Sequence, residues 1–199
     1  MSYPIAFEDL LPKSFDGTVF RTADLWQRII PIEKEVPLKY LEIGAFHGAN
    51  LISFASTYCQ GRQGVELHAI DPWIDYEEYP EYKGQQDVIF SKFKKNIHAA
   101  GLEDKVTVHR GFSHEVLHTL PDEYFDIIYV DGNHEPEYVC EDGVLAFRKL
   151  KKGGYMIFDD YGWGGPDMTQ RGIESFLSAY HKRMKVINIF EAQLYAQKL

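Results

Sequence analysis

Short β-prone runs alternate with helix-like segments along most of the chain, and this alternation strongly constrains the fold. The β-prone runs are Leu38–Gly44, Val65–Asp71, Lys105–Arg110, Phe125–Asp131 and Gly154–Asp159. The helix-like segments are Ala49–Tyr58, Gln85–Ala100, Ser113–Leu120, Pro136–Leu150 and Arg171–His181. Strands that alternate with helices are joined by right-handed crossovers. The pattern therefore predicts an α/β fold with a mostly parallel, doubly wound sheet that helices cover on both faces.

The alternation changes near both ends of the chain. Two β-prone runs, Lys185–Phe190 and Ala192–Gln197, follow each other almost directly, which predicts an antiparallel hairpin. Lys151–Gly154 is expected to cap the preceding helix. Residues 1–37, with a helix expected near Ala23–Ile30, are predicted to form an N-terminal helical cap. Residues 38–199 are predicted to form the main domain, within one structural domain overall.

Composition excludes several classes of protein. Met1–Asp16 lacks the basic flank and apolar run of an export signal, and no apolar run approaches the length of a membrane span. The only cysteines, Cys59 and Cys140, cannot build a disulfide framework, so we expect a reducing, cytoplasmic location. A net charge of −9 disfavours nucleic acid as a partner and favours a small molecule. The sequence leaves a homo-oligomer open.

The ends of the first two predicted strands carry the features of an adenosine site. Ligands of open α/β sheets bind beyond the carboxyl ends of the strands. The first strand runs into Glu42-Ile43-Gly44-Ala45-Phe46-His47-Gly48, where two glycines allow a sharp turn and close approach to a ligand. Asp71 ends the second strand, where a carboxylate can accept hydrogen bonds from two ribose hydroxyls. A nicotinamide cofactor is the rival, but the full G-x-G-x-x-G spacing is missing.

The order and spacing of five short motifs resemble those of class I S-adenosylmethionine-dependent methyltransferases, especially the subgroup related to sugar and macrolide O-methyltransferases. These motifs are Tyr40-Leu41-Glu42-Ile43-Gly44, Ala69-Ile70-Asp71, Gly111-Phe112-Ser113, Tyr129-Val130-Asp131-Gly132-Asn133-His134 and Gly153–Tyr161. The resemblance covers roughly Leu38 to Lys198 and implies a Rossmann-like methyltransferase domain.

The same resemblance assigns cofactor contacts. It implies that the methionine part of S-adenosylmethionine lies among Glu42, Gly44, Ala45 and Gly48. It places the ribose at Asp71 and the adenine beside Phe112 and Ser113, with Asp131 also at the cofactor.

Three acids at the ends of the fourth and fifth predicted strands point to a metal. Asp131, Asp159 and Asp160 lie at neighbouring strand ends, so their carboxylates can converge on one cation. Oxygen ligands suit Mg²⁺, and the resemblance implies that these three acids are metal ligands. A plain alternative is that Asp131 contacts the cofactor or acceptor while Asp159 and Asp160 form a solvated turn.

His134 lies three residues beyond Asp131 and is the candidate general base, because imidazole titrates near neutral pH. An ordinary surface histidine is the alternative, and Asp131 is then the candidate base. The aromatic segment Asp71–Tyr82, together with Trp163, is either a lid that stacks on an acceptor or a surface insertion that packs on the core.

These features together predict methyl transfer from S-adenosylmethionine to a hydroxyl of a small molecule or sugar, assisted by a divalent cation. Two other functions remain open: a methyltransferase-like module that binds cofactor without turnover, and, less favoured, an NAD-dependent oxidoreductase.

Overall fold

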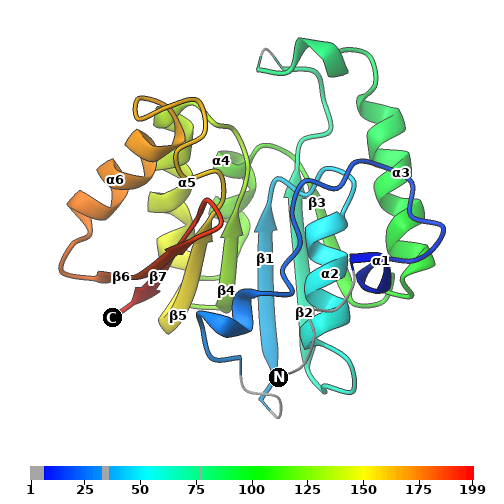
Figure 1. Cartoon of the computed structure of the whole chain (residues 1–199), viewed down its shortest axis with the longest axis horizontal. Helices are drawn as coiled ribbons and strands as arrows, with labels where there is room; N and C mark the ends of the chain where they lie inside the picture. The colour runs from blue at the N-terminus through cyan, green and yellow to red at the C-terminus, as the bar shows by residue number, and fades with distance from the viewer. Residues whose placement is uncertain (1–6, 33–35, 77) are drawn as a thin grey trace.

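The computed structural model describes residues 7–32, 36–76 and 78–199 and contains a seven-stranded sheet (Figure 1). The strand order is β3-β2-β1-β4-β5-β7-β6. The strands are β1 Leu38–Ile43, β2 Val65–Asp71, β3 Val106–Arg110, β4 Phe125–Val130, β5 Leu150–Phe158, β6 Met184–Phe190 and β7 Gln193–Lys198. The first five strands are parallel, and β7 pairs antiparallel with both β5 and β6. This order confirms the predicted class I methyltransferase arrangement with its terminal hairpin.

Helices cover both faces of the sheet, each over its own apolar cluster. One cluster joins α2 Ala49–Tyr58 and α3 Gln86–Ala99 to one face, and the other joins α5 Pro136–Lys149 and α6 Thr169–Ala179 to the opposite face (Figure 1). The shorter helical elements are α1 Phe7–Leu10, η1 Trp26–Arg28, η2 Pro80–Tyr82, α4 Ser113–Val116 and η3 Leu117–Thr119. Burial of strand residues from both sides explains the nearly continuous apolar runs of β1 and β4.

The chain reverses its direction of winding between β1 and β4. From β1 it proceeds through β2 to β3 on one side, and β4 returns to the other side of β1. At such a switch point the loops that follow the two strands diverge and leave a crevice for a ligand. The loops after β1 and β4 begin at Gly44 and Asp131, so this topology places two predicted site residues at the crevice.

The helix expected near Ala23–Ile30 is wrong: only the single 3₁₀ turn η1 forms there. Side chains of α2 hold the start of this segment through both backbone groups of Ala23. Ser53 Oγ accepts from the Ala23 N–H at 2.8 Å, and Tyr58 Oη donates to the Ala23 carbonyl at 2.6 Å. The segment is nevertheless part of the core, because Trp26 is fully buried. The predicted division at residue 37 stays a prediction, and residues 1–6 and 33–35 lie outside the described residues.

The expected cap at Lys151–Gly154 is also wrong, because β5 begins directly after α5 at Leu150. Leu150 is fully buried and pairs with Phe125, so burial draws the chain into the sheet earlier than the glycines suggest. Those residues instead form an irregularity in β5, since the pairing moves from Phe125↔Leu150 to Ile127↔Tyr155. The expected helix Ser113–Leu120 is divided into α4 and the 3₁₀ turn η3.

Among the helices in the described ranges, none combines the length and the apolar character needed to cross a bilayer. The cytoplasmic location expected from the sequence stays a prediction.

Candidate active site

One large cavity of about 1150 Å³ opens at the carboxyl ends of the parallel strands. It is lined by most of the residues that the sequence singles out: Gly44, Asp71, Phe112, Ser113, Asp131, His134, Asp159 and Asp160. Glu42, Ala45 and Gly48, which were also expected at the cofactor, are not among its lining residues. The fold therefore brings the predicted ribose, adenine and metal residues to one cavity, while part of the first loop lies outside its wall.

The loop after β1 is pressed against the loop after β4. Gly44 has φ +88°, and a Cβ added there would lie 1.7 Å from the backbone oxygen of Asp131. Only glycine can take this position, both for its dihedral angle and for its lack of a side chain. The close approach sets how far apart the two halves of the cavity lie.

Asp71 organises the first loop as well as lining the cavity. Its Oδ2 accepts from the Phe46 N–H at 2.9 Å, and its Oδ1 accepts from the Trp73 N–H at 2.9 Å. Burial raises the pKa of Asp71 to about 6, although hydrogen bonds from the backbone favour the ionised form. The carboxylate is therefore already held in place by the chain at the end of β2.

Glu42 lies beneath the cavity wall. Its Oε2 accepts from Tyr40 Oη at 2.6 Å and from Asn50 Nδ2 at 3.0 Å, and its residue is 1% exposed. Burial raises the pKa of Glu42 to about 7 despite these hydrogen bonds. In this arrangement Glu42 faces α2. Glu42 would therefore influence a cofactor only indirectly, through its charge and through its packing beneath the loop after β1.

A cluster of acids and one histidine occupies the other end of the cavity. Asp131, His134 and Asp160 each offer a ligand atom within 4.8 Å of the others. Asp160 has φ +53°, so the chain is already turning after β5, and Asp159 and Asp160 can both face the cavity. Asp159 is not part of the group of three, because its carboxylate faces Arg21: Arg21 Nε lies 3.3 Å from Asp159 Oδ1.

The acids of this cluster repel one another. Burial raises the pKa of Asp131 well above its usual range, and the charges of Asp159 and Asp160 raise it further. Burial and the charge of Asp160 also raise the pKa of Asp159. The Asp159 Oδ1 atom is buried and accepts no hydrogen bond from the described residues, and its charge is met by the ion pair with Arg21. One buried and two partly buried carboxylates this close together create a demand for positive charge.

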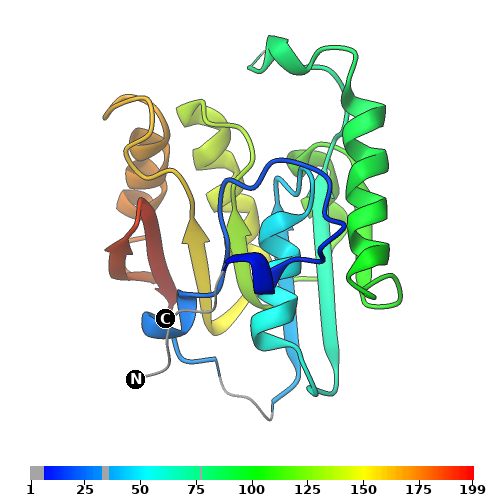
Figure 2. The same ribbon diagram turned by 45° about the vertical axis from the view of Figure 1, so that its right-hand side comes forward.

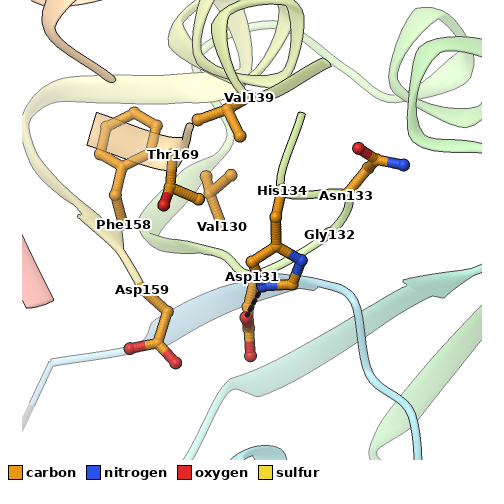
Figure 3. Close-up of a pocket in the computed structure, with 9 residues that line it drawn as sticks. All are labelled: Val130, Asp131, Gly132, Asn133, His134, Val139, Phe158, Asp159 and Thr169. Atoms are coloured by element: carbon orange, nitrogen blue, oxygen red, sulfur yellow. Dashed lines mark ion pairs between the residues drawn. The ribbon is translucent and has the colours of Figure 1, made fainter. Parts of the chain in front are cut away.

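His134 meets part of that demand. Figure 3 shows its ring reaching from the loop after β4 toward Asp131, in front of a wall that includes Val130, Val139 and Phe158. Its Nε2 lies 2.9 Å from Asp160 Oδ2 and 4.0 Å from Asp131 Oδ1.

The opposite edge of the His134 ring is held by an acid that sequence reasoning missed. Glu78 Oε1 lies 2.6 Å from His134 Nδ1 and accepts from the His134 N–H at 3.0 Å. Burial lowers the pKa of His134, but hydrogen bonds to Asp160 and Glu78 outweigh it and raise the pKa to about 10. The ring thus keeps a proton at neutral pH in this arrangement. Glu78 lies in an aromatic, acidic segment without a motif, so only the fold brings it to His134.

The aromatic segment after β2 divides between core and cavity. Trp73 is buried and packs on Phe90 and Phe93, as a core residue does. Tyr79 and Trp163 line the cavity, with ring centroids 5.9 Å and 4.8 Å from that of His134. Glu77, within the same segment, lies outside the described residues. Whether this segment acts as a lid stays a hypothesis.

Comparisons with known proteins agree with this arrangement. The sequence profile of a family described as a methyltransferase domain matches residues 41–161, which contain the switch point and the acidic cluster. The chain belongs to this family of methyltransferase domains. An uncharacterised protein of Acanthamoeba polyphaga mimivirus is 32% identical over 130 residues, which are 62% of this chain and 52% of that protein. The chain thus spans about half the length of this relative.

Solved structures share the fold at low sequence identity. The O-methyltransferase NovP has a TM-score of 0.62 and 19% identity, over 82% of this chain and 72% of NovP. The O-methyltransferase TomG from Streptomyces achromogenes, solved with S-adenosylmethionine, has a TM-score of 0.60 and 20% identity, over 80% and 72% of the two chains. A methyltransferase of Podospora anserina, solved with S-adenosylhomocysteine, has a TM-score of 0.58 and 19% identity, over 82% and 72%.

The buried Glu42 predicts a pH-dependent cost to stability. Its folded pKa of about 7 lies above the usual value of 4.5, so its favourable contribution is complete below about pH 4.5 and is lost as the pH rises through 7. Glu42→Gln mimics the protonated acid at every pH. Relative to this variant, the free energy of unfolding of the wild type should fall by up to about 3 kcal/mol between pH 4.5 and pH 8.

Urea denaturation at several pH values measures this difference. Glu115→Gln, at an exposed position, is the control and should follow the wild-type curve. Parallel curves for the wild type and Glu42→Gln would show that Glu42 is ionised in the native protein throughout this range.

Proposed function

We propose that this chain transfers the methyl group of S-adenosylmethionine to a hydroxyl oxygen of a small molecule. The observation that carries the proposal is the single cavity at the switch point, where Asp71 lines one end and the Asp131–Asp160 cluster the other. Family membership supports methyl transfer. The names of NovP and TomG, both described as O-methyltransferases, support oxygen as the acceptor atom.

The cofactor half of the cavity is assigned to the residues after β1, β2 and β3. Asp71 would accept hydrogen bonds from the ribose, Gly44, Ala45 and Gly48 would shape the loop beside the methionine part, and Glu42 would set the charge beneath it. Phe112 and Ser113 would border the adenine. The acceptor hydroxyl would then bind at the other end of the cavity, beside Asp131 and the acidic cluster. Holding both reactants in this geometry is the main contribution of the chain to the rate.

Cofactor titration tests this assignment. Asp71→Asn keeps the size of the side chain and one oxygen for the Phe46 N–H, but it loses the charge that strengthens bonds to two ribose hydroxyls. Each charge-assisted bond contributes about 1.5–3 kcal/mol, so S-adenosylmethionine should bind at least about tenfold more weakly in calorimetry.

Asp75→Asn is the matched control, because Asp75 lies in the same segment and accepts only from the Gly84 N–H. Equal affinity of the wild type and Asp71→Asn would remove Asp71 from the cofactor site. Binding of NAD in place of S-adenosylmethionine would favour the oxidoreductase.

The acidic cluster fits a divalent cation. Ligand atoms of Asp131, His134 and Asp160 lie within 4.8 Å of one another, and Asp159, which is paired with Arg21, lies next to Asp160. Burial, followed by the neighbouring negative charges, raises the pKa of Asp131 and of Asp159. Asp131, Asp159 and Asp160 would hold the ion, with His134 Nε2 in reach as a further donor. Hard oxygen donors favour Mg²⁺. When bound, such an ion lowers the pKa of an acceptor hydroxyl.

Removal of divalent cations tests this part of the proposal. Methyl transfer to an acceptor found by screening phenols and sugars should be lost in EDTA and restored by excess Mg²⁺. Full turnover in the chelator would reject the cation and leave methyl transfer itself unaffected. Cofactor binding without turnover under either condition would instead favour the binding module.

His134 is assigned to the proton of the acceptor hydroxyl. Its Nε2 faces Asp160 and its Nδ1 faces Glu78, so both ring nitrogens are occupied by carboxylates in this arrangement. A base must first be unprotonated, and the hydrogen bonds that the protonated ring donates to Asp160 and Glu78 oppose this. His134 therefore acts as a base only where Asp160 is engaged by another partner. Asp131 is the second candidate for the same proton.

Substitution of His134 separates catalysis from binding. His134→Ala should lower kcat by about 10²-fold, the usual contribution of a general base, with little change in affinity for S-adenosylmethionine. His114→Ala is the control, because His114 also lines the cavity but is exposed and outside the acidic cluster. Near-normal turnover of His134→Ala would transfer the role to Asp131 or to solvent.

A further inference from the structure

A segment before β1 contributes Phe20 and Arg21 to the wall of the cavity, and we name Asp16–Gln27 the N-terminal strap. Figure 2 shows this part of the chain (dark blue to blue) looping above α2 at the carboxyl end of the sheet before it descends to η1. Its first end is fixed by Asn96 of α3. Asn96 Oδ1 accepts from the Asp16 N–H at 2.9 Å, and Asn96 Nδ2 donates to the Asp16 carbonyl at 3.1 Å and to the His47 carbonyl at 2.9 Å.

The second end of the N-terminal strap is fixed by α2. Ser53 and Tyr58 hold both backbone groups of Ala23, and Tyr58 Oη also accepts from the Gln27 N–H at 3.1 Å. Between the two fixed ends, Phe20 and Arg21 both line the cavity. The strap therefore delivers two side chains to the site from outside the sheet.

Arg21 differs from every other described residue that lines the cavity, because it alone is a lysine or arginine. Its Nε lies 3.3 Å from Asp159 Oδ1, and its Nη2 lies 4.0 Å from Asp160 Oδ1. The Asp159 side chain is 3% exposed and that of Arg21 is 31% exposed. The guanidinium thus reaches from a solvent-accessible position to a carboxylate that the rest of the fold buries.

The charges explain what this contact does. Asp131, Asp159 and Asp160 require positive charge, and within the described cavity only Arg21 and His134 supply it from close range. A divalent cation would satisfy the same carboxylates. Two positive charges that share one cluster repel each other strongly at these distances, because screening by water is weak in a partly buried site.

We propose that Arg21, held in place by the N-terminal strap, competes with the divalent cation for Asp159 and so sets the affinity of the site for that cation. The inference rests on the cation site of the proposed function. In the arrangement described, Asp159 forms an ion pair with Arg21. The cation gains Asp159 as a ligand only when Arg21 moves away. By reciprocity, cation binding loosens the strap by the same free energy as the strap weakens cation binding. Arg21 is a positioning residue in this scheme.

Calorimetric titration with Mg²⁺ tests the competition without any need for turnover. Arg21→Met keeps much of the apolar stem and removes the charge, and it should bind Mg²⁺ at least about tenfold more tightly than the wild type, because one opposing charge is lost. Arg21→Lys keeps the charge and should bind Mg²⁺ with nearly wild-type affinity. Arg28→Met removes an equal charge from an exposed position of the same N-terminal region and should also resemble the wild type.

Thermal unfolding provides a second measurement, and it distinguishes competition with the cation from a purely structural role of Arg21. In EDTA, Arg21→Met should have a lower Tm than the wild type, because Asp159 loses its counter-charge. Added Mg²⁺ should raise the Tm of Arg21→Met more than that of the wild type, since at one concentration a ligand that binds the native state more tightly stabilises it more. A structural role alone would lower the Tm equally in EDTA and in Mg²⁺.

Equal or weaker Mg²⁺ binding by Arg21→Met would overturn the inference. If the wild type also binds Mg²⁺ and needs it for turnover, that result leaves the proposed function standing. If neither protein binds Mg²⁺, the cation site and the inference fail together, whereas the titration of Asp71→Asn with S-adenosylmethionine still tests the cofactor site.

Discussion

The contact between the loops that follow β1 and β4 is the constraint on which the whole site depends. Gly44 passes so close to the Asp131 backbone that a single added carbon would lie 1.7 Å from its carbonyl oxygen. This approach brings the loop held by Asp71 against the loop that carries Asp131 and His134. Because β1 and β4 are the strands at which the winding reverses, the loops that follow them diverge and both line one cavity.

Charge is distributed unevenly along that cavity. At the end of β2, Asp71 is held by backbone N–H groups and has a settled environment. At the ends of β4 and β5, three carboxylates lie close together, and their stabilisation depends on side chains from outside the sheet. His134 is clamped between Asp160 and Glu78, and Arg21 is held against Asp159. The fold therefore preorganises the end of the site at Asp71. At the acidic end, the positive charge comes from the side chains of His134 and Arg21.

The two ends of the site also differ in how easily the segments around them can move. Arg21 and Glu78 lie on segments outside the sheet, the N-terminal strap and the aromatic stretch after β2. Their contacts to the acidic cluster consist of a few hydrogen bonds and ion pairs, whereas the strand ends are held by the sheet and by two apolar clusters. Local opening of such segments costs less free energy than opening of the core. Under the proposed function, entry of an acceptor and exchange of a cation would therefore leave the sheet intact.

The sequence alone determined the parallel sheet, its terminal hairpin and the strand ends that carry Asp71, Asp131, Asp159 and Asp160. These follow from local signals: apolar runs, their alternation with helical segments, and the rule that parallel strands end at one edge.

Only the tertiary structure decided which side chains contact the site residues. Glu78 lies 56 positions before His134, and Arg21 lies in a region without any motif, so no local pattern reports either contact. It also decided that Glu42 faces Asn50 beneath the cavity and that Ala23–Ile30 forms only one 3₁₀ turn. In each case the hydrogen-bond or ion-pair partner of a residue depends on which side chains the packing brings near it, and no local sequence pattern specifies that partner.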